Sequence, residues 1–137
     1  MQCISVRCWE HGKLRIECCD CLKLINEIDM VIDFDKIEEV ATPNFKGGEG
    51  ITRMRTQFDG INKIMYGRLD VGCTIGYHAH EENSEVIYIT RGTARCLYDG
   101  GEERLTAGQC HYCPQGHSHG LINASDSESL EYFAVVG

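Results

Sequence analysis

Four residues in the second half of the chain carry groups that commonly bind transition metals: His78, His80, Glu85 and His119. His78 and His80 are separated by one residue in a stretch that is typical of a β-strand. Because strand side chains alternate between the two faces of a sheet, both imidazoles project to the same side. This spacing is suited to chelating a metal ion.

Glu85 begins another predicted strand, in which it shares a face with Ile87 and Ile89. A carboxylate on an apolar, inward face is costly unless a cation pairs with it, and a divalent metal is the obvious cation. His119 would complete the ligand set. Three imidazoles and one carboxylate suit Mn, Fe, Co, Ni, Cu or Zn rather than the all-oxygen shells of Ca or Mg. The sequence predicts one divalent transition metal per chain and leaves its identity open.

The residues after Met30 have the turn spacing of an all-β protein. Glycine-containing breaks such as Asp99-Gly100-Gly101 separate short alternating segments. Strands are predicted at residues 51–58, 63–70, 74–79, 85–90, 93–98, 102–106, 109–113, 118–123 and 130–136. Only residues 33–40 resemble a helix, and that helix would be brief. Many short strands without crossover helices favour an antiparallel sandwich or barrel.

Length and charge exclude several classes of protein. A chain of 137 residues has room for one hydrophobic core. Its formal charge of −8 and the lack of a basic run make nucleic acid an unsuitable partner. No apolar stretch approaches the roughly 18 residues needed to span a bilayer, and the charged start does not resemble a secretory signal. We therefore expect a cytoplasmic protein that does not bind membranes.

Cysteines are concentrated near the N-terminus. The chain has nine cysteines, and five of them precede residue 22. Because their number is odd and no export signal is present, we expect reduced thiols rather than disulfides. Their spacing lacks the paired arrangement of a zinc site. We expect residues 1–29 to be either a loosely attached extension or the product of a misplaced start codon, with the folded barrel at residues 30–137.

The two histidine-containing segments also resemble the cupin superfamily. Gly72-x5-His78-x-His80-x4-Glu85-x6-Gly92 reproduces the first signature of that superfamily, and Gly108-x5-Pro114-x-Gly116-x2-His119-x3-Asn123 reproduces the second. The resemblance implies an antiparallel double-stranded β-helix, the jelly-roll cupin barrel. It also implies that the four metal-binding positions of the family are occupied here by His78, His80, Glu85 and His119.

The resemblance further suggests a substrate class. Arg68 lies ten residues before His78, the offset at which oxalate decarboxylases of the superfamily place the arginine that holds the substrate carboxylate. A substrate-binding role for Arg68 is thereby implied. The carboxylic acid on the mobile lid of those enzymes has no equivalent between Gly92 and Gly108, which counts against decarboxylation itself.

We therefore expect a metal-dependent enzyme of cupin type, a decarboxylase, oxygenase or isomerase, that acts on a small anionic carboxylate metabolite. The alternative is a non-catalytic cupin that binds or senses a small molecule or a sugar. Small cupins commonly pair edge strands, so we also expect a homodimer, with residues 51–58 as the exchanged or augmenting strand.

The remaining histidines and thiols have simpler interpretations. His117 is expected at the rim of the site, and His111 has no identifiable partner. Cys110 and Cys113 form a C-x-x-C motif, but residues three positions apart on a strand face opposite sides of the sheet. We interpret them as two separate thiols rather than a redox or zinc pair.

Overall fold

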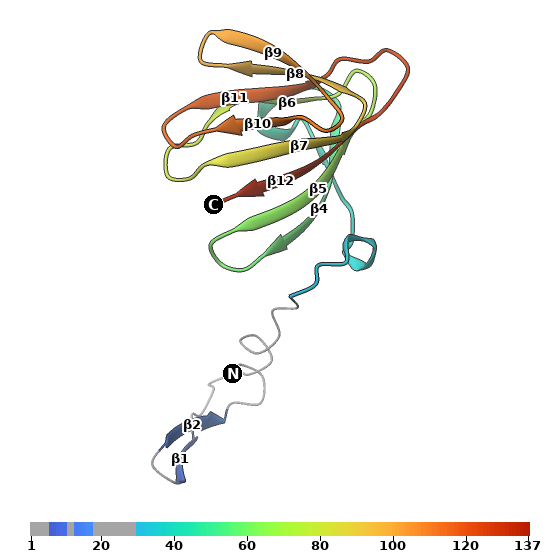
Figure 1. Ribbon diagram of the computed structural model, residues 1–137. Coiled ribbons are helices and arrows are strands. Elements are labelled where there is room, and N and C mark those ends of the chain that lie inside the picture. The colour runs from blue at the N-terminus through green and yellow to red at the C-terminus, as the bar shows by residue number, and fades with distance from the viewer. Residues whose placement is uncertain (1–5, 11–12, 18–29) are drawn as a thin grey trace. The chain divides into compact units, whose positions relative to one another are not determined.

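The computed structural model describes residues 6–10, 13–17 and 30–137 (Figure 1). The chain divides into two compact units, Met1–Ile32 and Asp33–Gly137. In the first, β1 (Val6–Glu10) and β2 (Lys13–Glu17) form an antiparallel hairpin in a region where the sequence shows no clear strand alternation. The interpretation of residues 1–29 as an extension remains a prediction.

The second unit consists of two antiparallel sheets. Its strands are β3 (Val40–Pro43), β4 (Ile51–Phe58), β5 (Lys63–Leu69), β6 (Thr74–Ala79), β7 (Glu85–Arg91), β8 (Thr93–Tyr98), β9 (Gly101–Thr106), β10 (Cys110–Cys113), β11 (Ser118–Asn123) and β12 (Leu130–Val136). A six-stranded sheet has the order β10-β7-β12-β5-β4-β3, and a four-stranded sheet has the order β6-β11-β8-β9 (Figure 1). The predicted all-β jelly-roll fold is confirmed.

The core lies between the inner faces of the two sheets. From Met65 to Leu69 on β5 and from Leu130 to Ala134 on β12 every second residue is buried, and Leu69, Leu130 and Tyr132 are almost completely enclosed. Tyr132 lies directly opposite Gly67. A β-carbon at Gly67 would come within 2.2 Å of the Tyr132 ring, so only glycine leaves room for this aromatic side chain in the core.

The predicted helix at residues 33–40 is wrong. Only one 3-10 turn forms, η1 (Phe34–Lys36), in which the Asp33 carboxylate accepts a hydrogen bond from the Asp35 N–H. Ile37 is already extended, with φ of −91° and ψ of 130°. Val40 then starts β3 and pairs with Met54 of β4, because a β-branched residue fits a pleated sheet better than a single helical turn.

The strand proposed to augment a second copy is not a free edge along its whole length. β4 pairs with β5 on one side, and its first half, Ile51–Met54, pairs with β3 on the other. Within the described chain, β3 rather than β4 is the last strand of the six-stranded sheet. The homodimer itself remains a prediction.

Loops after the strands are held by specific contacts. Asn123, the last residue of β11, donates from Nδ2 to the carbonyl oxygens of Leu69 and Glu128, and accepts at Oδ1 from the Ser125 N–H. Gly92 has a φ of +86°, and a β-carbon there would lie 2.7 Å from the Ser129 carbonyl oxygen. These two positions of the sequence motifs therefore have structural roles.

No helix in the described part of the chain is long and apolar enough to cross a membrane.

Candidate metal centre

Three strands from both sheets bring the four predicted ligands together. His78 lies on β6, His80 follows that strand, Glu85 begins β7 and His119 lies on β11. His119 pairs with His78, whereas Leu121 pairs with Ile75, so two residues of β6 oppose the single residue Gly120. This β-bulge lets Ile75 and His78 face the same cavity, which strict alternation would forbid.

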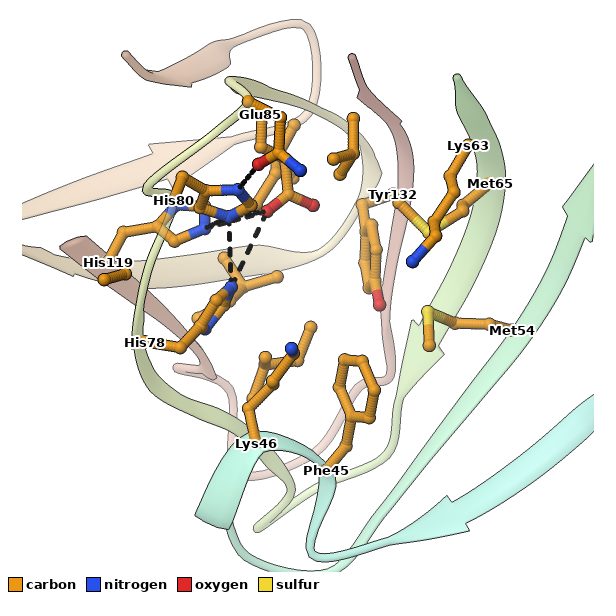
Figure 2. A pocket seen from close by; sticks show the side chains of 16 residues that line it. Phe45, Lys46, Met54, Lys63, Met65, His78, His80, Glu85, His119 and Tyr132 are labelled. Carbon is orange, nitrogen blue, oxygen red and sulfur yellow. Dashed lines mark hydrogen bonds and ion pairs between the residues drawn. The ribbon is translucent and has the colours of Figure 1, made fainter. Parts of the chain in front are cut away.

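The four side chains converge on one point (Figure 2). The Nε2 atom of His80 lies 3.1 Å from Nε2 of His78 and 3.0 Å from Nε2 of His119. The Oε2 atom of Glu85 lies 3.0 Å from Nε2 of His80, 2.8 Å from that of His119 and 3.9 Å from that of His78. Atoms bound to one ion at about 2.1 Å are about 3.0 Å apart when they occupy neighbouring octahedral positions. The donor set and its spacing fit a single transition metal ion.

Each histidine uses its other ring nitrogen for a contact that fixes the orientation of the ring. Nδ1 of His78 lies 2.8 Å from the Gly76 carbonyl oxygen, and Nδ1 of His80 lies 2.6 Å from Oδ1 of Asn83. Both partners are acceptors, so both rings carry hydrogen on Nδ1 and present the lone pair of Nε2 to the centre. His119 is held differently, by the imidazole of His111.

Burial and mutual charge act on the ionisable groups. Burial is the largest influence on the pKa of His78 and lowers it, which keeps the imidazole neutral and able to bind metal. Burial raises the pKa of Glu85, but its contact with His119 and the positive charge that the nearby imidazoles carry when protonated outweigh burial and leave this pKa below its usual value. These directions favour a carboxylate at Glu85 and a neutral imidazole at His78.

A cavity of about 150 Å³ opens beside the four ligands (Figure 2). Its wall includes apolar residues of both sheets, among them Met54, Met65 and Leu121. Two lysines, Lys46 and Lys63, also line it, and both side chains point inward from its edge in Figure 2. Neither lysine pairs with a carboxylate among the described residues. The cavity thus combines a candidate metal centre with two available positive charges.

The hydroxyl of Tyr132 is the other notable polar group in this wall. The residue is 1% exposed, and its hydroxyl has no hydrogen-bond partner within the described ranges. Burial raises the pKa of this phenol, so the group remains a hydrogen-bond donor. Buried polar groups are usually paired, which makes an unpaired one next to a cavity informative about what the cavity holds.

Arg68 does not share this cavity. It lies on β5 between the buried residues Gly67 and Leu69, so its side chain is on the opposite, outer face of the sheet. There it approaches Asp70, with 3.3 Å between Nε and Oδ1, and it lies opposite Arg53 of β4. This outer position does not fit the substrate-binding role that the sequence implied for Arg68. Tyr132 packs over Gly67, so Gly67 faces the core and its neighbour Arg68 faces outward.

His117 lies beyond the site. Its Nδ1 pairs with Oδ2 of Asp99, and both side chains are exposed. The hydrogen bond from His117 is the main reason why the pKa of Asp99 is lowered. The two cysteines of the C-x-x-C pattern face opposite sides of β10, Cys110 exposed and Cys113 buried, which confirms that they do not form a pair.

The contact of His111 with the candidate ligand His119 was not predicted, because the sequence offered no identifiable partner for His111. It is 4% exposed, shares the inner face of β10 with Cys113, and touches His119. Its spacing of two residues from Cys113 was the available signal, because on a strand this spacing places the imidazole on the same face as the thiol.

Comparisons with known proteins agree with this architecture. The sequence profile of the cupin domain matches residues 65–136. An oxalate-binding protein of Thermotoga maritima is 26% identical over 113 residues, which cover 78% of this chain and 93% of that protein.

Solved structures have the same fold as this chain. The crystal structure of a predicted oxalate decarboxylase from Thermotoga maritima is 26% identical, with a TM-score of 0.73 over 78% of this chain and 97% of that chain. A sugar phosphate isomerase of the cupin superfamily from Silicibacter pomeroyi shares the fold at 22% identity, with a TM-score of 0.64 over 77% of this chain and 74% of that one.

Proposed function

This chain belongs to the cupin family, and on that basis we propose that it binds one divalent transition metal and holds a small carboxylate anion against it. The metal ligands are His78, His80, Glu85 and His119. A bound metal would act as a Lewis acid that accepts a carboxylate oxygen. The observation that carries the proposal is the pair of lysines facing the same cavity as this ligand set.

Lys46 and Lys63 would recognise the charge of the anion. They come from opposite sides of the cavity mouth, Lys46 from the turn η2 (Phe45–Gly47) and Lys63 from the start of β5. Lys63 shares the inward face of β5 with Met65, so its ammonium group is directed to the cavity. An anion with a carboxylate at each end could contact the metal centre and an ammonium group together.

The size of the cavity restricts the anion to a few non-hydrogen atoms. Its volume of about 150 Å³ is below the roughly 300 Å³ at which pockets for drug-sized ligands begin. The similarity to an oxalate-binding protein suggests oxalate as the first anion to test. A sugar, the neutral alternative, would leave both lysines without a counter-charge.

Binding is better supported than turnover. Apart from the four candidate metal ligands, the ionisable residues in the cavity wall are Lys46, Lys63 and Tyr132. None is a carboxylic acid that could serve as an additional general acid or base beside the metal. Metal-dependent catalysis on the same anion is the second candidate, and the hydroxyl of Tyr132 is the one neutral proton donor in this wall that would favour it.

The proposal is tested by titrating oxalate calorimetrically into protein loaded with Mn²⁺ and into protein stripped by a chelator. We expect one oxalate per chain in the loaded protein and at least tenfold weaker binding in the stripped protein, because the metal supplies one of the two contact points. Since free oxalate chelates metals, the metal content is measured again after gel filtration. Equal affinity in both samples would overturn the proposal, and tighter binding of glucose than of oxalate would favour the sugar alternative.

Substituting Tyr132→Phe should separate ligand binding from stability. In the ligand-free protein the buried hydroxyl is unpaired, so its removal should leave the melting temperature unchanged or raise it. A bound anion would supply the missing acceptor, and hydrogen bonds to charged groups contribute about 1.5–3 kcal/mol. We therefore expect about tenfold weaker oxalate binding with unchanged metal content. A lower melting temperature with unchanged oxalate affinity would give the hydroxyl a structural role instead.

A further inference from the structure

Behind the metal ligand His119 lies a second buried imidazole that leads to a surface carboxylate. We propose that His111 and Glu103 are positioning residues that fix the hydrogen of His119 on Nδ1 and so keep its Nε2 free for the metal. The inference rests on the metal site proposed above. It assigns to two residues outside that site a role in how well the metal is held.

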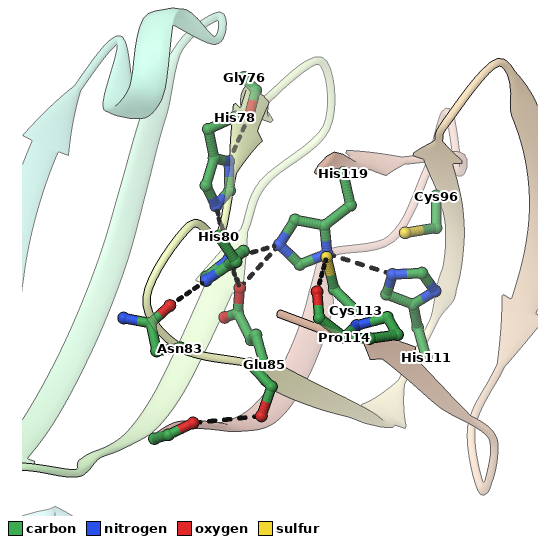
Figure 3. A network of polar contacts seen from close by, with 12 residues as sticks. Gly76, His78, His80, Asn83, Glu85, Cys96, His111, Cys113, Pro114 and His119 are labelled. Atoms are coloured by element: carbon green, nitrogen blue, oxygen red, sulfur yellow. Dashed lines mark hydrogen bonds and ion pairs between the residues drawn. The ribbon is translucent and has the colours of Figure 1, made fainter. Parts of the chain in front are cut away.

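The three residues form one continuous chain of hydrogen bonds, and Figure 3 shows its inner contact, between His119 and His111. Nδ1 of His119 lies 3.1 Å from Nε2 of His111, and Nδ1 of His111 lies 2.6 Å from Oε1 of Glu103. His119 and His111 are 1% and 4% exposed, whereas the Glu103 side chain is 43% exposed. The hydrogen-bonded chain therefore runs from the buried centre to solvent, and the planes of its two imidazole rings are inclined by only 27°.

Only one arrangement of hydrogens satisfies the two hydrogen bonds between His119, His111 and Glu103 when His119 binds a metal. A carboxylate can only accept, so Nδ1 of His111 must carry the hydrogen that points to Glu103. Nε2 of the neutral His111 is then an acceptor, and it can pair only with an N–H on Nδ1 of His119. Nε2 of His119 is left with its lone pair directed at Glu85 and His80, where the metal would lie.

This support differs from that of the other two histidines. His78 and His80 donate to a carbonyl and an amide oxygen, which are neutral acceptors. His119 alone is linked, through His111, to a negative charge. A negatively charged partner makes an imidazole a stronger metal donor, and the loss of such partners typically weakens metal binding about 10- to 100-fold.

The same location has a competing explanation. Cys96, His111 and His119 are close enough to bind a second metal ion by themselves. However, Nε2 of His111 and Nδ1 of His119 are already paired with each other. Burial also raises the pKa of the Cys96 thiol to about 12, so the thiolate that a metal requires is disfavoured. A hydrogen-bonded chain accounts for the contacts better than a second metal site.

Glu103→Gln is the most informative variant. Glutamine can donate as well as accept, so it permits the reversed chain in which His111 donates to Nδ1 of His119 and the hydrogen of His119 moves to Nε2. We expect three- to tenfold weaker Zn²⁺ binding by competition with a chelator. His111→Leu, which removes the acceptor, should weaken binding at least tenfold. Glu102→Gln is the matched control, because Glu102 neighbours Glu103 on β9 but pairs with Arg95.

Nitrogen-15 NMR of the Zn²⁺-loaded protein reports the hydrogen on Nδ1 of His119. This signal would not change if Glu103 only stabilised the fold. In the parent protein and in Glu102→Gln, His119 should show a protected hydrogen on Nδ1 with a strongly downfield shift. In Glu103→Gln this signal should move upfield or broaden. The proposal is overturned if Glu103→Gln retains both the parent affinity and the parent signal, or if the parent binds two Zn²⁺ ions per chain. A parent that binds no metal would instead refute the proposed function.

Discussion

Substituting His80→Ala is expected to abolish metal binding. Nε2 of His80 lies within 3.1 Å of the donor atoms of His78, His119 and Glu85, so its removal breaks up the set at its centre. We expect at least a hundredfold loss of affinity. A ligand present at a hundred times its dissociation constant stabilises a folded protein by about 2.7 kcal/mol. The rise in melting temperature that Mn²⁺ or Zn²⁺ causes in the parent should therefore disappear.

His117→Ala is the control for this experiment. His117 lies close to His119 in the sequence, but its exposed side chain pairs with Asp99 rather than with the centre. Metal content by elemental analysis and melting curves with and without added metal should match those of the parent. If His80→Ala keeps stoichiometric metal at unchanged affinity, the assignment of the four ligands is wrong.

Replacing both Lys46 and Lys63 by alanine should remove most of the affinity for oxalate while the metal stays bound. The two ammonium groups are the cations in the cavity wall outside the candidate metal centre. Because both lysines are exposed at the mouth, salt screens them, and each alone should contribute only a few-fold. Together we expect a loss of at least tenfold, measured by calorimetry at low ionic strength, and the parent affinity should fall as salt is added.

Arg68→Ala is the matched control for the lysines. It removes a cation of the same charge from β5, but from the outer face, where it approaches Asp70. Oxalate affinity should stay within twofold of the parent value. If Arg68→Ala weakens oxalate binding and the double lysine variant does not, the anion does not bind in this cavity.

The strands and the shared face of His78 and His80 could be predicted because both depend on local patterns, whereas His119 was placed with them by the resemblance of the two separated motifs to the cupin superfamily. The boundaries of β4, β6, β8, β11 and β12 agree with the sequence expectation, since alternating side chains and glycine turns are visible in short windows. The spacing of His78 and His80 determines their shared face in the same way. β3 was missed because its four residues carry little alternation and end in Pro43.

Other features depend on contacts between distant residues. The inward face of β5 is decided by Tyr132 packing over Gly67, 65 positions earlier in the chain, so an offset counted from His78 could not orient Arg68. Lys46 reaches the cavity from a turn that packs against β6. There a β-carbon at Gly76 would lie 2.0 Å from the Lys46 carbonyl oxygen. No local pattern in the sequence reports that contact.

The origin of the cavity residues has a consequence for how such a protein can diverge. The candidate metal ligands lie on or directly after β6, on β7 and on β11, whereas the ammonium groups come from η2 and the start of β5. Selection can therefore alter the charge of the η2 turn without replacing the histidines. Descendants of one ancestral barrel could come to bind different small molecules through a few changes at the rim, while the four candidate metal ligands are kept. Gly76 sets the boundary of that freedom, because any larger residue there would push the rim away from the strand that carries His78.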